Sequence, residues 1–248
     1  MKALATSYLD AAIGLLERIR DEEPPGLTEA GERIASAIAE GRRVFAFGCS
    51  HSSLPVQDIV YRAGGLMLIN PLFAPGLSGL DVRPVTLTSE LERLSGLART
   101  VVDHSPLEAG DVLIVVSASG RNAVPVEVAE EAAARGCTVI AVTSREYSST
   151  VDSRHASGRK MHEFADVVLD NKVPPGDAAL DVEGVPQAIG PVSGILSAAV
   201  LQALVAEVVE QLLARGIEPP VFLSGNVDGG LEYNARQLSE HGDRIYYL

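Results

Sequence analysis

The chain has 248 residues, of which 46% are apolar and 21% are charged, so it is neither a disordered nor a collagen-like polymer. Lys and Arg number 20 against 33 Asp and Glu, which gives a net charge of −13 with neutral histidines. An acidic surface repels nucleic acid and anionic membranes, so we expect neither as a partner, and an anionic ligand would need a local, preorganised site.

The first 41 residues predict a helical extension. Apolar positions recur at helical spacing from Leu4 to Ile19, and the acids among them are atypical of a signal peptide. Thr28 is expected to cap a second helix, which ends near Gly41. The sequence therefore predicts no secretion signal at this end.

The number and spacing of the cysteines indicate the redox conditions of the cell compartment. Cys49 and Cys137 lie 88 positions apart and form no CxxC pair, which argues against a disulfide framework or a zinc site. No His, Asp or Glu pair has the spacing of metal ligands. We therefore expect a cytoplasmic protein with no metal and no cofactor.

Short apolar runs alternate with amphipathic segments through the rest of the chain. The runs typical of buried strands are residues 44–47, 66–69, 112–116, 139–142 and 167–169. Helices are predicted at residues 54–63, 89–98, 123–135 and 192–215. This alternation predicts a doubly wound α/β fold, a three-layer sandwich with a five-stranded parallel sheet. We expect a single domain over residues 1–248, with the helical extension at 1–41 and a C-terminal helical segment at 217–248.

Three tracts differ from this alternating pattern. Residues 71–85, and residues 145–161 with 174–191, are long polar or Gly- and Pro-rich connections, which are more often functional than accidental in a compact domain. The apolar stretch 198–213 is interrupted by Gln and Glu and is too short for a bilayer about 30 Å thick. It therefore predicts a buried helix.

Ligands of doubly wound sheets bind outside the carboxyl ends of the strands, and this sequence places hydroxyl groups there. Three of the runs are followed by Gly48-Cys49-Ser50-His51-Ser52-Ser53, by Ser117-Ala118-Ser119-Gly120-Arg121-Asn122 and by Thr143-Ser144. With the free N–H groups of the following helix N-termini, these hydroxyls predict a neutral cradle for a phosphate group. The alternative is that Ser119 only caps a helix. The GxGxxG and GxxxxGK[ST] patterns are absent, which argues against a dinucleotide or Walker-type site.

Two of these segments resemble a known family. Phe47-Gly48-Cys49-Ser50-His51-Ser52 and Val115-Val116-Ser117-Ala118-Ser119-Gly120 are similar, in order and separation, to the signature loops of the SIS (sugar isomerase) domain. The resemblance covers about residues 30 to 220 and implies a flavodoxin-like sheet. It implies that a phosphosugar phosphate is held by Ser50, Ser52, Ser117, Ser119 and Asn122. Relatives often have Thr and Gln at positions 49 and 118, so backbone N–H groups are expected to replace those contacts here.

Further segments narrow the resemblance. They are Tyr61-Arg62-Ala63-Gly64-Gly65, Ser89-Glu90-Leu91-Glu92-Arg93, Ser153-Arg154-His155-Ala156-Ser157-Gly158 and Gly190-Pro191-Val192-Ser193. They resemble a subgroup of free-standing bacterial SIS proteins grouped with phosphoheptose isomerases. That subgroup is similar to the N-acetylglucosamine-6-phosphate dehydratase of actinomycetes and, more distantly, to the N-acetylmuramic acid 6-phosphate etherases.

Abstraction of the C2 proton of an open-chain sugar needs a base in a partly dry pocket. Ser89 and Glu92 have the spacing of a capping box, which favours a structural role for Glu92 and places Glu90 in the first helical turn. Glu90 is therefore the predicted base, and an acid that only stabilises a helix N-terminus is the alternative.

Histidines and arginines complete the set of candidates. His51 is expected to open the sugar ring or shuttle a proton, or else to fill space beneath its loop. His155 is expected to close over the substrate, or else to be exposed in a mobile loop. Arg93, Arg121 and Arg154 are candidates for binding phosphate or sugar hydroxyls, with pairing to neighbouring acids as the alternative.

Three functions follow from the resemblance. A lyase that dehydrates N-acetylglucosamine 6-phosphate removes the C2 proton and the C3 hydroxyl, and so needs a base and a general acid. An aldose-ketose isomerase, like phosphoheptose isomerase, needs the base and stabilisation of an oxyanion. A non-catalytic phosphosugar sensor is the third function, although the first 40 residues are too few and too acidic for a DNA-binding module.

The resemblance also bears on assembly, because SIS domains typically form dimers. The N-terminal helix and the 198–213 helix carry more apolar surface than one small sheet needs. We therefore expect a homodimer with the site near the interface and a small phosphosugar as ligand.

Overall fold

The computed structural model describes residues 3–79 and 81–248. Its centre is a five-stranded sheet with the order β2-β1-β3-β4-β5. The strands are β1 (Val44–Gly48), β2 (Ile69–Pro71), β3 (Val112–Val116), β4 (Thr138–Thr143) and β5 (Val167–Asp170), and all pair in parallel. The predicted doubly wound fold with the flavodoxin-like order is confirmed.

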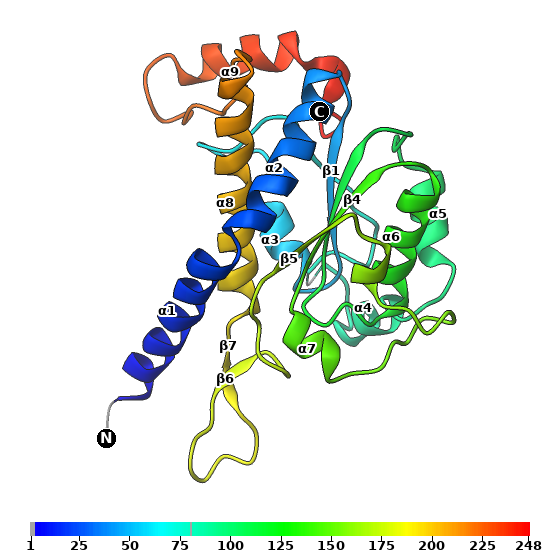
Figure 1. Cartoon of the computed structure of the whole chain (residues 1–248), viewed down its shortest axis with the longest axis vertical. Coiled ribbons are helices and arrows are strands. Elements are labelled where there is room, and N and C mark those ends of the chain that lie inside the picture. The colour runs from blue at the N-terminus through cyan, green and yellow to red at the C-terminus, as the bar shows by residue number, and fades with distance from the viewer. Residues whose placement is uncertain (1–2, 80) are drawn as a thin grey trace.

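Helices cover both faces of this sheet (Figure 1). On one face lie α2 (Pro24–Ala39), α3 (Ser53–Asp58) and α8 (Ser193–Ala214), and on the other lie α5 (Leu97–Asp103) and α6 (Ala123–Ala134). Successive strand residues face opposite layers, so Val44 and Ala46 join the first core and Phe45 and Phe47 the second. Because both faces of each strand are buried, the strand sequences are continuous apolar runs and not alternating patterns.

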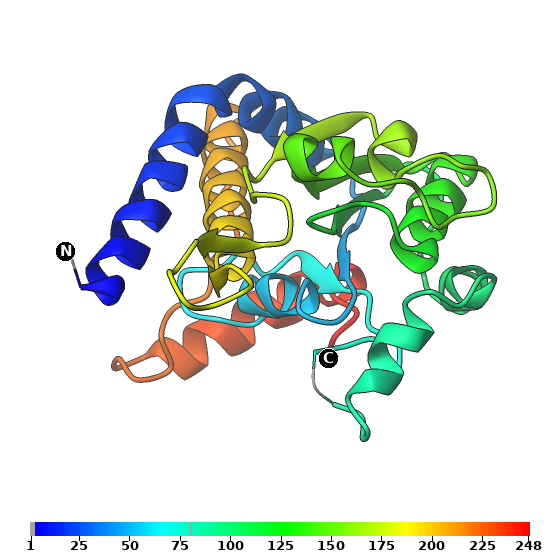
Figure 2. The same cartoon turned by 90° about the horizontal axis from the view of Figure 1, so that it is seen from below.

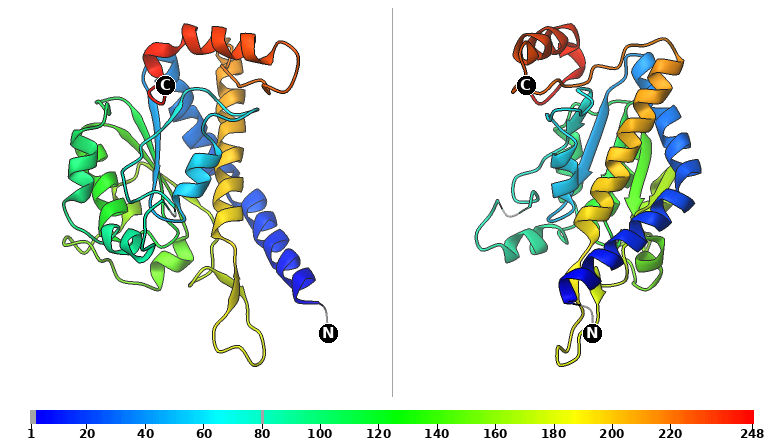
Figure 3. Two further views of the ribbon diagram at one scale, coloured as in Figure 1. Left: turned by 180° about the vertical axis from the view of Figure 1, so that it is seen from behind. Right: turned by 90° about the vertical axis from the view of Figure 1, so that its left-hand side faces the viewer.

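The remaining elements lie around this sandwich. The N-terminal helix α1 (Leu4–Glu22) runs beside α8 and extends past the sheet (Figure 3). The antiparallel pair β6 (Ala178–Leu180) and β7 (Ile189–Pro191) precedes α8 and contacts α1, and in Figure 2 this hairpin lies in front of the near end of α8. The helices α4 (Thr86–Leu91), α7 (Arg145–Ser149) and α9 (Gly230–Glu240) and two short 3₁₀ turns, Met161–Phe164 and Gly242–Arg244, complete the described elements.

The helix α8 has the length and hydropathy of a membrane span. In the structure it packs along α2 and α3, and its buried side chains, which include Leu196, Val200 and Leu204, belong to the core beneath the sheet. This packing agrees with the prediction of a buried helix.

Several predicted elements differ from the structure. The second strand lies at Ile69–Pro71 rather than 66–69, because Leu66 and Met67 pair with the segment around Val221 instead of with β1. The helix predicted at 89–98 is wrong: α4 and α5 are separate, with Gly96 left-handed (φ +86°) at the start of α5. A continuous helix cannot accommodate that conformation.

The predicted ends of the chain also need correction. Thr28 does not cap α2, because that helix begins at Pro24, where a proline needs no hydrogen-bond partner for its nitrogen. In the C-terminal segment only α9 is a full helix, and the last residues run back along the sheet, where Tyr247 donates to the carbonyl of Met67. The 54–63 helix is shorter than predicted and ends at Asp58.

Candidate functional site

The loop after β1 is a tight turn. A Cβ at Gly48 would overlap the carbonyl of Ser52, so only glycine lets the chain fold back here. Ser50 has a positive φ of 51°, and the Ser53 hydroxyl holds the turn by donating to the Ser50 carbonyl at 2.7 Å. His51 is exposed and Ser52 is half-buried beside it. The turn therefore keeps Ser50, His51 and Ser52 at the carboxyl end of the sheet.

The loop after β3 is the second turn at this end. The N–H of Gly120 donates to the buried Ser117 hydroxyl at 3.2 Å, so Ser117 shapes the loop. Gly120 has φ +60°, and a Cβ there would press on Thr143. Within the part of the chain that the structure describes, the hydroxyls of Ser50, Ser52 and Ser119 have no hydrogen-bond partner. Those three hydroxyls are available to a ligand.

The hydroxyls after β4 have a different role. Thr143 Oγ1 donates to the Ala118 carbonyl at 3.2 Å, and Ser144 donates to the Val173 carbonyl at 2.6 Å. The N–H of Ser144 also binds the Ala118 carbonyl at 3.0 Å. These groups support the β3 loop from behind and are not free to form the predicted cradle.

A buried guanidinium nitrogen lies in the same loop. Arg121 Nε is buried and has no hydrogen-bond partner among the described residues. A buried donor without a partner costs free energy, and an anion would satisfy it. The loop thus contains a free serine hydroxyl at Ser119 and an unpaired cationic donor two positions later.

Glu92 lies between the two loops. It follows α4, and the N–H of Val124 in the first turn of α6 donates to its carbonyl at 3.1 Å. The Asn122 amide donates to its Oε1 at 2.9 Å. Burial raises the pKa of the Glu92 carboxyl, an effect that Asn122, Arg93 and Arg154 partly oppose. The negative charge of Glu92 contributes, after burial, to raising the pKa of the Cys49 thiol, which places Glu92 near the β1 loop.

Glu90 lies outside this cluster. Its side chain is 73% exposed and its Oε1 is 3.7 Å from Arg93 Nη1. The capping-box prediction is wrong, because α4 begins at Thr86 and Ser89 lies inside it rather than at its N-cap. Glu90 therefore lies in the last turn of α4, whereas Glu92 passes beyond the helix end and turns toward the loops.

Two arginines, Arg93 and Arg154, act on the Glu92 carboxyl, and Arg121 lies next to Arg154. The N–H of Arg154 donates to the Arg121 carbonyl at 2.8 Å, and its Nη1 donates to the Asn122 Oδ1 at 2.9 Å. Burial and the charges of Arg121 and Arg93 lower the pKa of Arg154. The candidate site is therefore locally cationic within an acidic protein.

His155 faces a different surface. Its Nε2 lies 3.8 Å from Glu127 and 3.7 Å from Glu130, both on α6, and its Nδ1 contacts the Ser157 hydroxyl at 2.8 Å. Its side chain is only 10% exposed, so it is not the exposed loop histidine of the alternative prediction. The structure places it against α6 and not among the serine loops.

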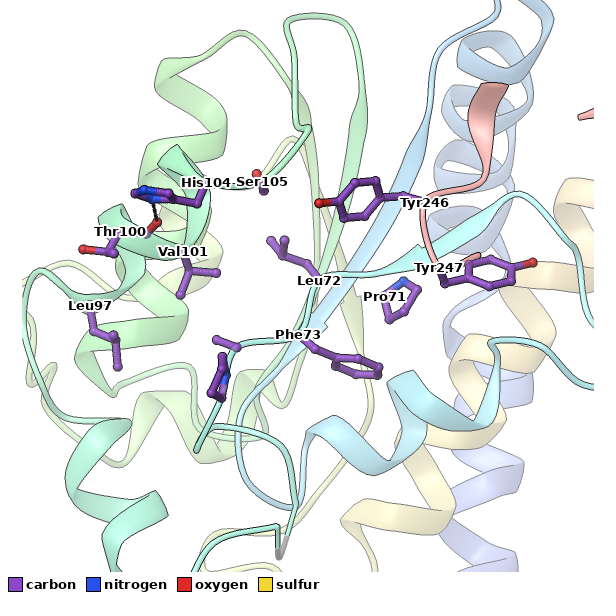
Figure 4. A pocket seen from close by; sticks show the side chains of 12 residues that line it. Pro71, Leu72, Phe73, Leu97, Thr100, Val101, His104, Ser105, Tyr246 and Tyr247 are labelled. Carbon is purple, nitrogen blue, oxygen red and sulfur yellow. Dashed lines mark hydrogen bonds between the residues drawn. The ribbon is translucent and has the colours of Figure 1, made fainter. Parts of the chain in front are cut away.

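A separate cavity of about 690 Å³ lies beyond the edge strand β2 (Figure 4). Figure 4 shows it between α5 and the chain end, with Leu72, Phe73, Val101, Tyr246 and Tyr247 around it. Its lining contains none of the predicted site residues and few charged groups. It therefore lacks the chemistry expected of a phosphate site.

The fold and the paired serine loops define a class of protein. The family model of the SIS domain matches residues 7–144, more than half of the chain, and the chain belongs to the SIS domain family.

Relatives cover nearly its whole length. It is 54% identical over 244 residues to a UPF0309 protein of Streptomyces griseus, with 98% of this chain and 97% of that protein covered. It is 42% identical over 241 residues to a UPF0309 protein of Shouchella clausii, with 97% and 98% covered.

Solved structures share the fold. The phosphoheptose isomerase GmhA of Neisseria gonorrhoeae superposes with a TM-score of 0.53 at 17% identity, covering 82% of this chain and 96% of that one. A phosphoheptose isomerase of Francisella tularensis gives 0.51 at 18% identity, with 85% and 100% covered. At sequence identities of 17% and 18%, these comparisons show a shared fold and no more.

Proposed function

We propose that the protein is an enzyme that acts on a phosphosugar at the carboxyl end of its sheet. The phosphoryl group would lie among the hydroxyls of Ser50, Ser52 and Ser119, with Arg121 beside it. The observation that carries this proposal is that the two serine loops hold free hydroxyls and, two positions after Ser119, the buried and unpaired Arg121 Nε. Membership of the SIS family supports the same ligand class.

Within this site we propose Glu92 as the general base in place of Glu90. A carboxyl group whose pKa is raised by burial is suited to accept a carbon-bound proton near neutral pH. Glu92 also lies next to both serine loops, whereas Glu90 faces solvent. The expected roles of Glu90 and His155 in catalysis have no geometric support, and the experiment below tests the choice between the two carboxylates.

The proposed reaction is the dehydration of an N-acetylhexosamine 6-phosphate such as N-acetylglucosamine 6-phosphate. Glu92 takes the C2 proton of the open-chain sugar, the C2–C3 double bond forms, and the C3–O bond breaks. The departing hydroxyl takes a proton and leaves as water, with exposed His51 at the site mouth as the proposed acid. The net change is loss of one water molecule, so no oxidant or reductant is needed.

Isomerisation is the second candidate reaction, and the fold of the named phosphoheptose isomerases favours it. The same base would take the C2 proton and return it to C1, and the nearby arginines would stabilise the enediolate oxygen. A sensor would bind the ligand without moving this proton. Product analysis separates the three functions.

The base is tested with a matched pair of variants, Glu92→Gln and Glu90→Gln, two residues apart. For Glu92→Gln we expect turnover of N-acetylglucosamine 6-phosphate to fall by about 10²- to 10⁴-fold, while calorimetry still detects binding. For Glu90→Gln we expect turnover close to that of the wild type. Loss of turnover in Glu90→Gln with normal turnover in Glu92→Gln would overturn the assignment.

We further propose a cytoplasmic homodimer. Leu9 and Ile13, four positions apart on one face of α1, are each more than half exposed, as is expected of a face that a second copy covers. Both cysteines are free and buried, which suits a reducing compartment.

A further inference from the structure

Asn122 occupies the N-cap position of α6 but does not act as a cap. An N-cap asparagine normally accepts a hydrogen bond from the N–H of the second or third helical residue. Here the N–H of Val124 is taken by the Glu92 carbonyl at 3.1 Å, and the third residue is Pro125, which has no N–H. The Asn122 side chain is therefore free for other partners.

Its two partners are the charged groups of the proposed site. The Asn122 Nδ2 donates to Glu92 Oε1 at 2.9 Å, and its Oδ1 accepts from Arg154 Nη1, also at 2.9 Å. Both ends of the amide are thus occupied, which fixes the amide orientation because a flip would face like groups toward each other.

We infer that Asn122 is a positioning residue, which holds Glu92 for proton abstraction and links it to Arg154, rather than the phosphate ligand that the sequence predicts. The part of this inference that concerns proton abstraction rests on the proposed function, whereas the hydrogen bonds of Asn122 do not depend on it. One Glu92 oxygen is committed to the amide, and Oε2, the other oxygen, is left for the substrate.

The contact also has an electrostatic consequence. The groups that act on Glu92 are Asn122 before α6, Arg93 next to it and Arg154 after α7, while the thiol of Cys49 after β1 feels the charge of Glu92. Donation from Asn122 stabilises the ionised carboxylate and so lowers its pKa, against the effect of burial. Removal of the donor must therefore raise the pKa of Glu92.

The substitution Asn122→Asp tests this directly. It keeps the acceptor for Arg154 but removes the donor to Glu92 and adds a second carboxylate. The matched control is Asn234→Asp, because the Asn234 amide also bridges two groups, the N–H and the carbonyl of Leu223, far from the site along the chain. If Asn122→Asp fails to fold, Asn122→Ala removes the donor without adding charge and is expected to shift the pKa in the same direction.

The readout is the ¹³C titration of the Glu92 side-chain carboxyl by NMR, assigned from its absence in Glu92→Gln. We expect a higher midpoint in Asn122→Asp than in wild type, and no change in Asn234→Asp. The acidic limb of kcat/KM is expected to move to higher pH by the same amount. We also expect kcat to fall by about 100-fold, with a smaller change in KM, as for a misplaced catalytic group.

Two outcomes separate this inference from the proposed function. An unchanged Glu92 midpoint in both Asn122 variants, with normal wild-type turnover, would overturn the positioning role and leave the proposed function intact. A shifted midpoint in a protein that turns over no phosphosugar would support the amide contact and overturn the proposed function.

Discussion

Glu92 illustrates how one side chain differs from its neighbours in a short segment. Glu90 and Glu92 are two positions apart, yet one is 73% exposed and the other is held between two loops. Glu92 is the C-cap of α4 and keeps helical φ and ψ values, so the two positions lie about 200° apart around the helix and their side chains face different sides. Sequence spacing alone predicted the opposite placement of the two side chains, because Ser89 and Glu92 have the spacing of a capping box, whereas α4 begins at Thr86.

The raised pKa of Glu92 predicts a pH-dependent effect on stability. The carboxyl loses its proton at a higher pH in the folded protein than in the unfolded chain, whose ordinary value is near 4.5. The stability contributed by this group is therefore present below that value and is lost as pH rises through the folded pKa. We expect Glu92→Gln to unfold at a higher temperature than wild type at pH 7.5, with the difference much smaller at pH 4.

Calorimetric unfolding at the two pH values measures this difference. Glu90→Gln is the control, and we expect it to show little change at either pH. A Glu92→Gln protein less stable than wild type at pH 7.5 would mean that Glu92 is stabilised by its arginines more than it is penalised by burial.

At the scale of elements, an ion cluster joins the N-terminal helices to the sheet. Lys172 follows β5 and is 7% exposed, and its Nζ lies 2.9 Å from Glu22, 2.7 Å from Glu23 and 3.1 Å from Asp170. Glu23 also accepts the N–H of Asp170 at 3.0 Å, at the junction of α1 and α2. The cluster therefore holds the junction of α1 and α2 against the end of β5.

Lys172→Met tests this junction. The substitution keeps much of the side-chain length but leaves the Glu23 and Asp170 carboxylates buried without their cation, so we expect a loss of about 3–5 kcal/mol in unfolding free energy. Combining it with Glu23→Gln should recover part of the loss. Chemical denaturation measures both effects, and a loss below about 1 kcal/mol for the single variant would contradict a structural role for the cluster.

Much of the element order could be predicted from the sequence, and the failures have physical causes. Residues 112–116 form β3 as predicted, because five buried apolar residues in a row have few other arrangements. The second strand was displaced because Leu66 is buried equally well against the C-terminal segment. The β6–β7 hairpin lies in the predicted 174–191 connection, where its exposed residues give no alternating pattern.

The serine loops were predicted to meet at one end of the sheet, and the structure places them there, but the contacts among their residues were not predicted. Ser50 and Ser119 lie in the expected loops because strand ends in a parallel sheet meet at one edge. The pairing of Asn122 with Glu92 and Arg154 joins residues up to 32 positions apart, which no local pattern reveals. Pro125 is the only sequence signal, since it removes one partner of the expected cap.

The whole molecule carries a net charge of −13 and an exposed apolar face on α1. The exposed fractions of Leu9 and Ile13, which share one face of the helix, are 58% and 53%. Tyr8, on a different side of the helix, donates to the Pro191 carbonyl at 2.9 Å and so holds α1 against the hairpin. A second copy covering Leu9 and Ile13 would remove this apolar surface from water.

We predict a mass of about twice the 26.1 kDa of one chain in solution at micromolar concentration. The double substitution Leu9→Lys and Ile13→Lys should give a monomer, because two buried charges are costly at an apolar interface. Leu248→Lys, at a 71% exposed position outside α1 and α8, serves as the control. Light scattering after gel filtration measures the mass in solution, and a wild-type mass near 26 kDa would contradict the dimer.

The proposal that this site moves a C2 proton of a phosphosugar is tested most directly by proton NMR in D2O. Wild-type protein would be incubated with N-acetylglucosamine 6-phosphate and, in parallel, with hexose and heptose phosphates. We predict a new vinyl signal and loss of the C3 proton environment for the N-acetylated sugar, and no such change with Glu92→Gln. Unchanged spectra for every sugar, with no deuterium at C2, would contradict the proposed enzyme.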